Sequence, residues 1–129
     1  MTVDDFRRLA LDMQGAIESA HMGHPDFRAN GRIFASIHSN DRFGMVALEP
    51  SEQRALMQTH PKLFEPSSGA WGRQGCTNVR LDGRSGGDEV VVRGALLLAW
   101  THVMERRPPR SITDKKPPRK RATKSSRRS

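Results

Sequence analysis

The side chains that carry most catalytic and metal chemistry are present in this sequence, but not at the spacings that assemble a reaction centre. Cysteine occurs once, as Cys76, and the five histidines show no Cys-x2-Cys or His-x3-His spacing of the kind that holds zinc. The chain also lacks a nucleophile elbow, a phosphate-cradling glycine loop and a readable pair of carboxylates. The sequence therefore predicts a protein that is not an enzyme, with no catalytic residue, no metal ion and no cofactor.

Another group of side chains suits binding. In the stretch AWGRQGCTNVRL, from Ala70 to Leu81, Trp71 and Arg73 precede a strand-like alternation. One interpretation is that the glycines permit backbone angles closed to other residues while Trp71 covers an edge of the core. The other is that Trp71 offers a stacking plane and Arg73, with Arg80, contacts phosphate. Both can hold together.

The positive charge of the chain is concentrated at its C-terminal end. Residues 106–129 contain eleven Lys or Arg and one acid, a net charge of +10, whereas residues 1–105 carry a net charge of −2. Each phosphate that a cation neutralises adds about −0.9 to the slope of log affinity against log salt. Such contacts do not distinguish one base from another. Residues expected to contact phosphate here are Arg110, Lys115, Lys116, Arg119, Lys120, Arg121, Lys124, Arg127 and Arg128.

The composition of residues 106–129 predicts a disordered tail, because two Pro-Pro pairs and dense like charge leave almost no apolar surface to bury. The remaining residues, 1–105, are expected to form one domain that needs no disulfide or metal to fold. No apolar run approaches the about 20 residues that span a bilayer. With its lone cysteine and acidic start, the sequence favours a cytoplasmic protein that does not interact with membranes.

Helices are predicted at both ends of the domain. Thr2 and Asp5 have capping-box spacing, and apolar residues at steps of three and four extend this first amphipathic helix to Ala20. A closing helix begins near Asp88, with its apolar positions again at helical spacing. Pro50 predicts the start of a short helix that continues to about Thr59.

Strands occupy the segments between these helices. Asn30-Gly31 and the turn at residues 39–41 separate alternating runs and predict an antiparallel meander. Residues 61–75 are expected to form a loop, and residues 76–81 alternate as a strand with one buried face. This order of elements predicts an α+β fold, a two-layer sandwich with an antiparallel sheet and the N- and C-terminal helices on one face.

The other face of that sheet should meet solvent. Side chains alternate along a strand, so Ile33, Ala35 and Ile37 pointing inward would turn their neighbours outward. The residues expected on the outer face are Arg28, Arg32, Phe34, Ser36, His38 and Arg80. This pattern predicts a mixed basic and aromatic surface, on which Arg28, Arg32 and Arg80 act with the Trp71 and Arg73 loop.

The segments GHPDFRANGRIFASI and WGRQGCTNVRL, followed by an amphipathic helix, resemble the YjbR/MmcQ family of small bacterial proteins. The resemblance extends over about Val3 to Met104. It implies a frataxin/CyaY-like sandwich and a DNA-binding role. Cys76 stands where the family often has a second Trp, so a stacking role of that aromatic is not carried over, and the basic tail lies outside the shared domain.

Together these features predict a monomeric, non-enzymatic protein that binds nucleic acid, with DNA favoured, mainly through sequence-independent phosphate contacts of the tail. Such a protein could associate with the nucleoid. The alternative is a protein-interaction adaptor that binds a protein through the exposed sheet face or the Trp71 loop, and whose tail is a solubilising or targeting device. An enzyme acting on an acidic small molecule is a third, weaker alternative.

Overall fold

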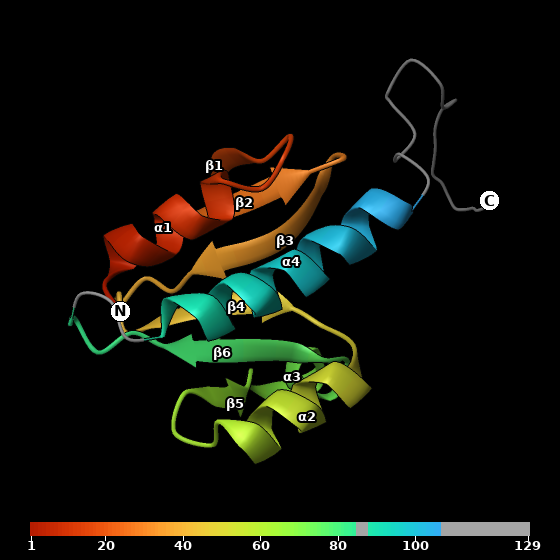
Figure 1. Ribbon diagram of the computed structural model, residues 1–129. Coiled ribbons are helices and arrows are strands. Elements are labelled where there is room, and N and C mark those ends of the chain that lie inside the picture. Colours follow the sequence, from red (N-terminus) through yellow and green to blue (C-terminus); the bar gives the residue numbers. More distant parts are fainter. Residues whose placement is uncertain (85–87, 107–129) are drawn as a thin grey trace.

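The computed structural model describes residues 1–84 and 88–106, which form one antiparallel sheet with α1 and α4 packed on one side (Figure 1). The six strands lie in the order β1-β2-β3-β4-β6-β5, and every neighbouring pair is antiparallel. The elements are α1 (Val3–Leu11), β1 (Ile17–His21), β2 (His24–Ala29), β3 (Arg32–Ile37), β4 (Phe43–Ala47), α2 (Pro50–Thr59), β5 (Phe64–Pro66), α3 (Gly69–Arg73), β6 (Cys76–Arg80) and α4 (Glu89–Glu105). The predicted α+β class and the helices on one face are confirmed.

The first helix begins as predicted but ends early. The Thr2 hydroxyl accepts from the Asp5 N–H, and the Asp5 carboxylate accepts from the Thr2 N–H, both at 3.0 Å. The predicted extension to Ala20 is wrong, because Gly15 adopts a φ of +76° and the chain turns into β1. Strand β1 is an edge strand whose backbone pairs with β2, so Ile17 is 62% exposed rather than part of a buried helix face.

The two turns of the meander are confirmed. Asn30 and Gly31 both have positive φ, 55° and 72°, which matches the twist of the flanking strands β2 and β3. Asp41, with a φ of 60°, supplies the turn between β3 and β4. Helix α2 has the predicted bounds, but the predicted loop at residues 61–75 contains β5 and α3. These two elements are too short to produce a readable periodicity in the sequence.

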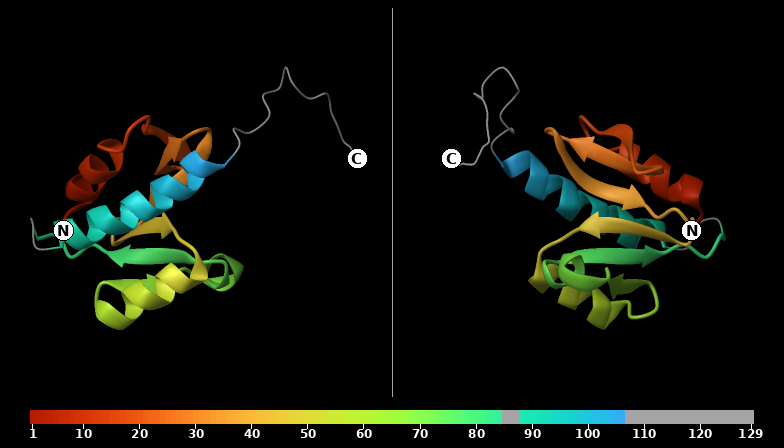
Figure 2. Two further views of the ribbon diagram at one scale, coloured as in Figure 1. Left: turned by 45° about the vertical axis from the view of Figure 1, so that its right-hand side comes forward. Right: turned by 180° about the vertical axis from the view of Figure 1, so that it is seen from behind.

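The core lies between the sheet and the helices α1 and α4. Phe6 from α1, Phe27 from β2 and Leu96 from α4 are completely buried, and the rings of Phe6 and Phe27 meet edge to face at 6.3 Å. Two views from other directions show α4 running across the sheet and the opposite face free of long helices (Figure 2). None of the helices in residues 1–84 and 88–106 is long and apolar enough to cross a membrane.

A β-bulge in β3 changes the predicted orientation of its first residues. Phe27 is opposite Ala35 and Arg28 is opposite Ile33, so Phe34 is an extra residue in β3. An extra residue reverses the in-out alternation on one side of the bulge. Phe34 is therefore completely buried and Ile33 is 40% exposed, the reverse of the prediction. Arg32 lies opposite the buried Ala29, on the helix-covered side of the sheet and not on its outer face.

Candidate ligand groove on the open face of the sheet

Arg28 lies on the open face as predicted, but its charge is already paired. Its guanidinium binds both carboxylate oxygens of Asp26, at 2.8 and 3.1 Å. Asp26 is only 3% exposed, and its hydrogen bond and negative charge raise the pKa of Arg28. A buried carboxylate that lost this partner would be strongly destabilising, which makes Arg28 a structural counter-ion.

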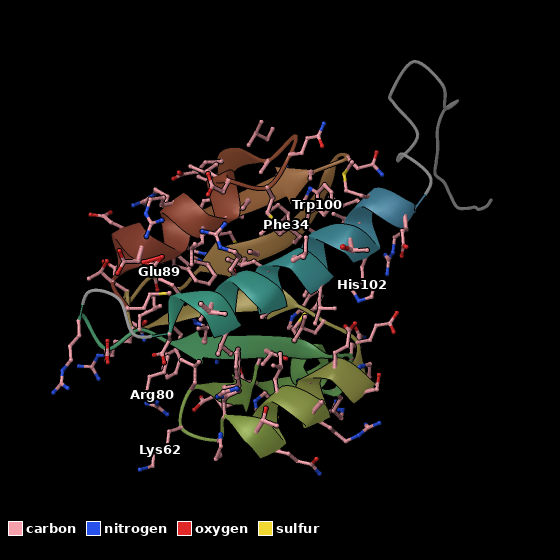
Figure 3. The ribbon with its side chains drawn as sticks, in the orientation of Figure 1. Phe34, Lys62, Arg80, Glu89, Trp100 and His102 are labelled. Atoms are coloured by element: carbon pink, nitrogen blue, oxygen red, sulfur yellow. The ribbon has the colours of Figure 1, made fainter. Side chains whose placement is uncertain are left out.

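Arg80 is also engaged within the chain. Its guanidinium donates to the Glu65 carboxylate at 3.1 Å and to the Lys62 carbonyl at 3.2 Å (Figure 3). The same group lies 5.3 Å from the centroid of the Phe43 ring, a cation–π contact. The predicted outward orientation is confirmed, but Glu65 compensates the positive charge that phosphate would need.

Trp71 and Arg73 have a different environment. Both side chains are exposed on α3, and Trp71 keeps 68% of its surface in solvent. Within residues 1–84 and 88–106, Arg73 makes no ion pair. The remaining predicted contacts, Arg110, Lys115, Lys116, Arg119, Lys120, Arg121, Lys124, Arg127 and Arg128, lie outside the described residues. Among the predicted basic residues that the structure describes, Arg28 and Arg80 lie on the open face of the sheet and Arg32 lies on the other, so these residues do not form one patch.

The open face instead carries a partly enclosed groove of about 500 Å³ between the strands and α3. Its lining is mainly apolar and includes Ile33, Met45, Ala47 and Trp71. This volume is within the roughly 300–1,000 Å³ typical of small-ligand sites. The groove was not predicted, because the β-bulge turns Ile33 outward and α3 brings Trp71 above the strands.

Polar groups also line the same groove. His24, Ser36, His38, Ser67 and the half-buried Cys76 contribute to its surface. The outward orientation of Ser36 and His38, which strand alternation predicted, is confirmed. Burial raises the pKa of the Cys76 thiol, so the thiol is the prevailing form at neutral pH.

The buried side chain of Asn78 orients two of these groups. The Ser67 hydroxyl donates to Asn78 Oδ1 at 2.8 Å, and His38 Nε2 lies 3.2 Å from the same oxygen. With the Asn78 amide assigned in this orientation, Nε2 of His38 carries the proton and Nδ1 is an acceptor. Asn78 therefore fixes the orientation of a hydroxyl group and an imidazole that both face the groove, where they can hydrogen-bond to a ligand.

Two glycines and one glutamine hold α3 in place. A Cβ on Gly72 would lie 1.8 Å from the Ser67 carbonyl oxygen, and one on Gly75 would lie 2.1 Å from that of Leu48. The buried amide of Gln53 donates to the carbonyls of Gly72 and Cys76, both at 3.0 Å. The interpretation that a backbone angle requires glycine is confirmed for Gly75, whose φ is +112°, but Gly72 has no positive φ and is required by its close approach to Ser67. The companion interpretation, in which Trp71 covers the core, is wrong because the ring is exposed.

A separate cluster joins α2 to α4. Ligand atoms of Glu49, Glu52 and His102 lie within 4.8 Å of one another, and His102 Nε2 is 2.7 Å from Glu52 Oε1 (Figure 3). Glu52 also accepts from the Glu49 backbone N–H at 3.0 Å. These hydrogen bonds account for the cluster, and the positive end of the α2 dipole disfavours a cation there. Sequence spacing could not reveal it, because His102 lies fifty residues from Glu52.

Comparisons with known proteins agree with the fold. No family model matches the chain, and no curated protein matches its sequence. The chain is similar in structure to Deinococcus radiodurans protein DR2400, which has a DUF419 domain, with a TM-score of 0.65 and 19% identity. The match covers 81% of this chain and 80% of that chain. At this identity the similarity establishes a shared fold.

Proposed function

We propose that this chain belongs to the YjbR/MmcQ family and binds nucleic acid, with DNA favoured, without catalysing a reaction. The observation that carries the proposal is the division of charge, +10 in residues 106–129 against −2 in residues 1–105. Phosphate contacts from lysine and arginine supply most sequence-independent affinity for DNA. Residues 106–129 are therefore the main source of binding energy.

The ion pairs of the domain support this division of roles. Arg28 is bound to Asp26 and Arg80 to Glu65, so neither offers an uncompensated charge to a phosphate. Arg32 lies on the helix-covered side of the sheet. Among the residues of the domain predicted to contact nucleic acid, Trp71 and Arg73 have side chains exposed to solvent and therefore accessible to it.

The test is a titration of duplex DNA at several salt concentrations with the full chain and with a chain that ends at residue 106. If six cations of the C-terminal segment engage phosphates, the slope of log affinity against log salt is about −5 for the full chain. The shortened chain should lose most of its affinity and give a much flatter slope. Equal affinity and equal slope for the two proteins would refute the proposal.

A protein-interaction role is the second candidate, because α4 exposes apolar side chains to solvent. Val90 is 85% exposed, Leu97 48% and Met104 41%, all on the side of α4 that faces away from the sheet. Exposed apolar patches of this kind mark contact surfaces for other proteins. This candidate predicts a complex with a defined protein that survives nuclease and high salt and is lost in Leu97→Glu.

A further inference from the structure

We propose that the groove on the open face of the sheet holds a single unstacked nucleobase, which stacks on the Trp71 ring. This inference rests on the proposed nucleic-acid binding, in which the cations of residues 106–129 supply most of the affinity. It adds a binding site for the base itself. It also names the form of nucleic acid that the domain prefers, which is single-stranded.

The exposure of Trp71 is the first observation behind this site. Tryptophan is usually well buried, yet this ring keeps 68% of its surface in solvent. Its helix is nevertheless held firmly, since Gly72 packs against the Ser67 carbonyl and Gln53 binds the Gly72 carbonyl. A large aromatic face on a fixed backbone suits stacking, because little conformational entropy is lost when a base binds.

The lining of the groove fits a heterocyclic ring. Ile33, Met45 and Ala47 form an apolar surface beside Trp71, and the volume of about 500 Å³ is sufficient for a base and part of its sugar. His38 Nδ1 is an acceptor when Nε2 is bound to Asn78, and Ser36 and Ser68 add hydroxyl groups. A base edge carries both donors and acceptors, so these groups can pair with it.

The charges around the groove favour a neutral ring over a phosphate. Asp26, the acidic residue of the lining, is compensated by the two hydrogen bonds from Arg28. Arg73 is exposed on the same helix as Trp71 but is not among the residues that line the groove. A duplex keeps its bases stacked and paired, so it cannot offer a base to the groove without paying the cost of unstacking.

The experiment compares a single-stranded oligonucleotide with an abasic strand of the same length, using the full chain at one salt concentration. The abasic strand keeps every phosphate and lacks the bases. We expect the base-containing strand to bind about ten-fold more tightly, the effect of stacking one base. Trp71→Ala should remove this difference and leave the affinity for the abasic strand unchanged.

The matched control is Leu97→Ala, which shortens a different exposed apolar side chain on α4, away from the groove. It should retain the ten-fold preference. As an independent readout, the base-containing strand should slow alkylation of Cys76, which lines the groove, and the abasic strand should not. This readout needs no substitution, so it is independent of any folding defect.

The outcomes separate this inference from the proposed function. Equal affinities for the two strands, with equal alkylation of Cys76, would overturn the base site and leave phosphate binding intact. Absence of binding to either strand would overturn the base site, and absence of binding to duplex DNA as well would overturn the proposed function. A ten-fold preference that persists in Trp71→Ala would also overturn the inference, because the base would then bind elsewhere.

Discussion

At the scale of single residues, neighbouring groups decide which arginines are available to a ligand. Arg28 and Arg80 point to the open face of the sheet, yet Asp26 and Glu65 bind their guanidinium groups. Arg73 has no ion pair among the described residues, and its side chain is exposed on α3. The same residue type therefore has a structural role in two positions and is open to a ligand in the third.

Gly75 allows a prediction at this scale. Its φ of +112° is unfavourable for other residues, and a Cβ would lie 2.1 Å from the Leu48 carbonyl oxygen. Gly75→Ala should therefore lower the free energy of unfolding by about 3 kcal/mol or more, because both backbone strain and a clash are introduced. Urea denaturation measures this loss.

The matched control is Gly15→Ala, at a φ of +76° with no atom within 4 Å of the added Cβ. Only the backbone term applies there, so the loss should be about 1 kcal/mol. Equal losses for the two substitutions would show that contact with Leu48 is unimportant.

At the scale of elements, α4 combines a buried face with an apolar exposed face. Val92, Leu96 and Ala99 pack into the core, while Leu97 remains 48% exposed and Gly94 is exposed within the helix. A glycine in a helix interior lowers helix stability unless a close contact requires it. Within the described residues, nothing lies within 4 Å of a Cβ at Gly94.

Gly94→Ala should therefore stabilise the protein by about 0.5–1 kcal/mol, since the added methyl group costs no contact and reduces the freedom of the unfolded chain. Thermal unfolding monitored by circular dichroism measures the change. Gly44→Ala is the opposing control, because its Cβ would meet the Phe6 ring at 2.7 Å and should destabilise. If Gly94→Ala instead destabilised the protein, this face of α4 would have to pack against another surface.

At the scale of the whole molecule, charge and fold are separated along the chain. The buried residues of the core extend from Met1 to Val103, and the net charge of +10 belongs to residues 106–129. A change of charge on the domain and the same change in the C-terminal segment should therefore have different effects on DNA binding.

Two triple variants test this separation. The first variant replaces three cations of the C-terminal segment by Gln: Arg119, Lys120 and Arg121. If all three neutralise phosphates, the slope of log affinity against log salt for duplex DNA should become about 2.7 less steep. The second variant removes the same charge from exposed positions of the domain, by replacing Arg42, Arg54 and Arg80 with Gln. It should leave the slope nearly unchanged. Fluorescence anisotropy across salt concentrations measures both. Equal reductions would mean that the whole surface contributes.

The sequence was informative about local structure. The capping box of Thr2 and Asp5, the Asn30-Gly31 turn and Pro50 depend on neighbouring residues, and the structure confirms each of them. It was less informative where a short element or a bulge breaks periodicity, as at β1, β5 and α3. The predicted outward orientation of Phe34 was wrong because the bulge adds one residue to β3 and reverses the alternation of its side chains.

By itself the sequence determined the charge of each segment, the α+β class and the turns, because these follow from composition and from contacts between near neighbours. Only the tertiary structure decided which arginines are paired, that Trp71 is exposed, and that a groove lies beside it. Those properties depend on contacts between residues far apart in the chain, such as His38 and Asn78, which are forty positions apart. A local sequence pattern therefore cannot predict them.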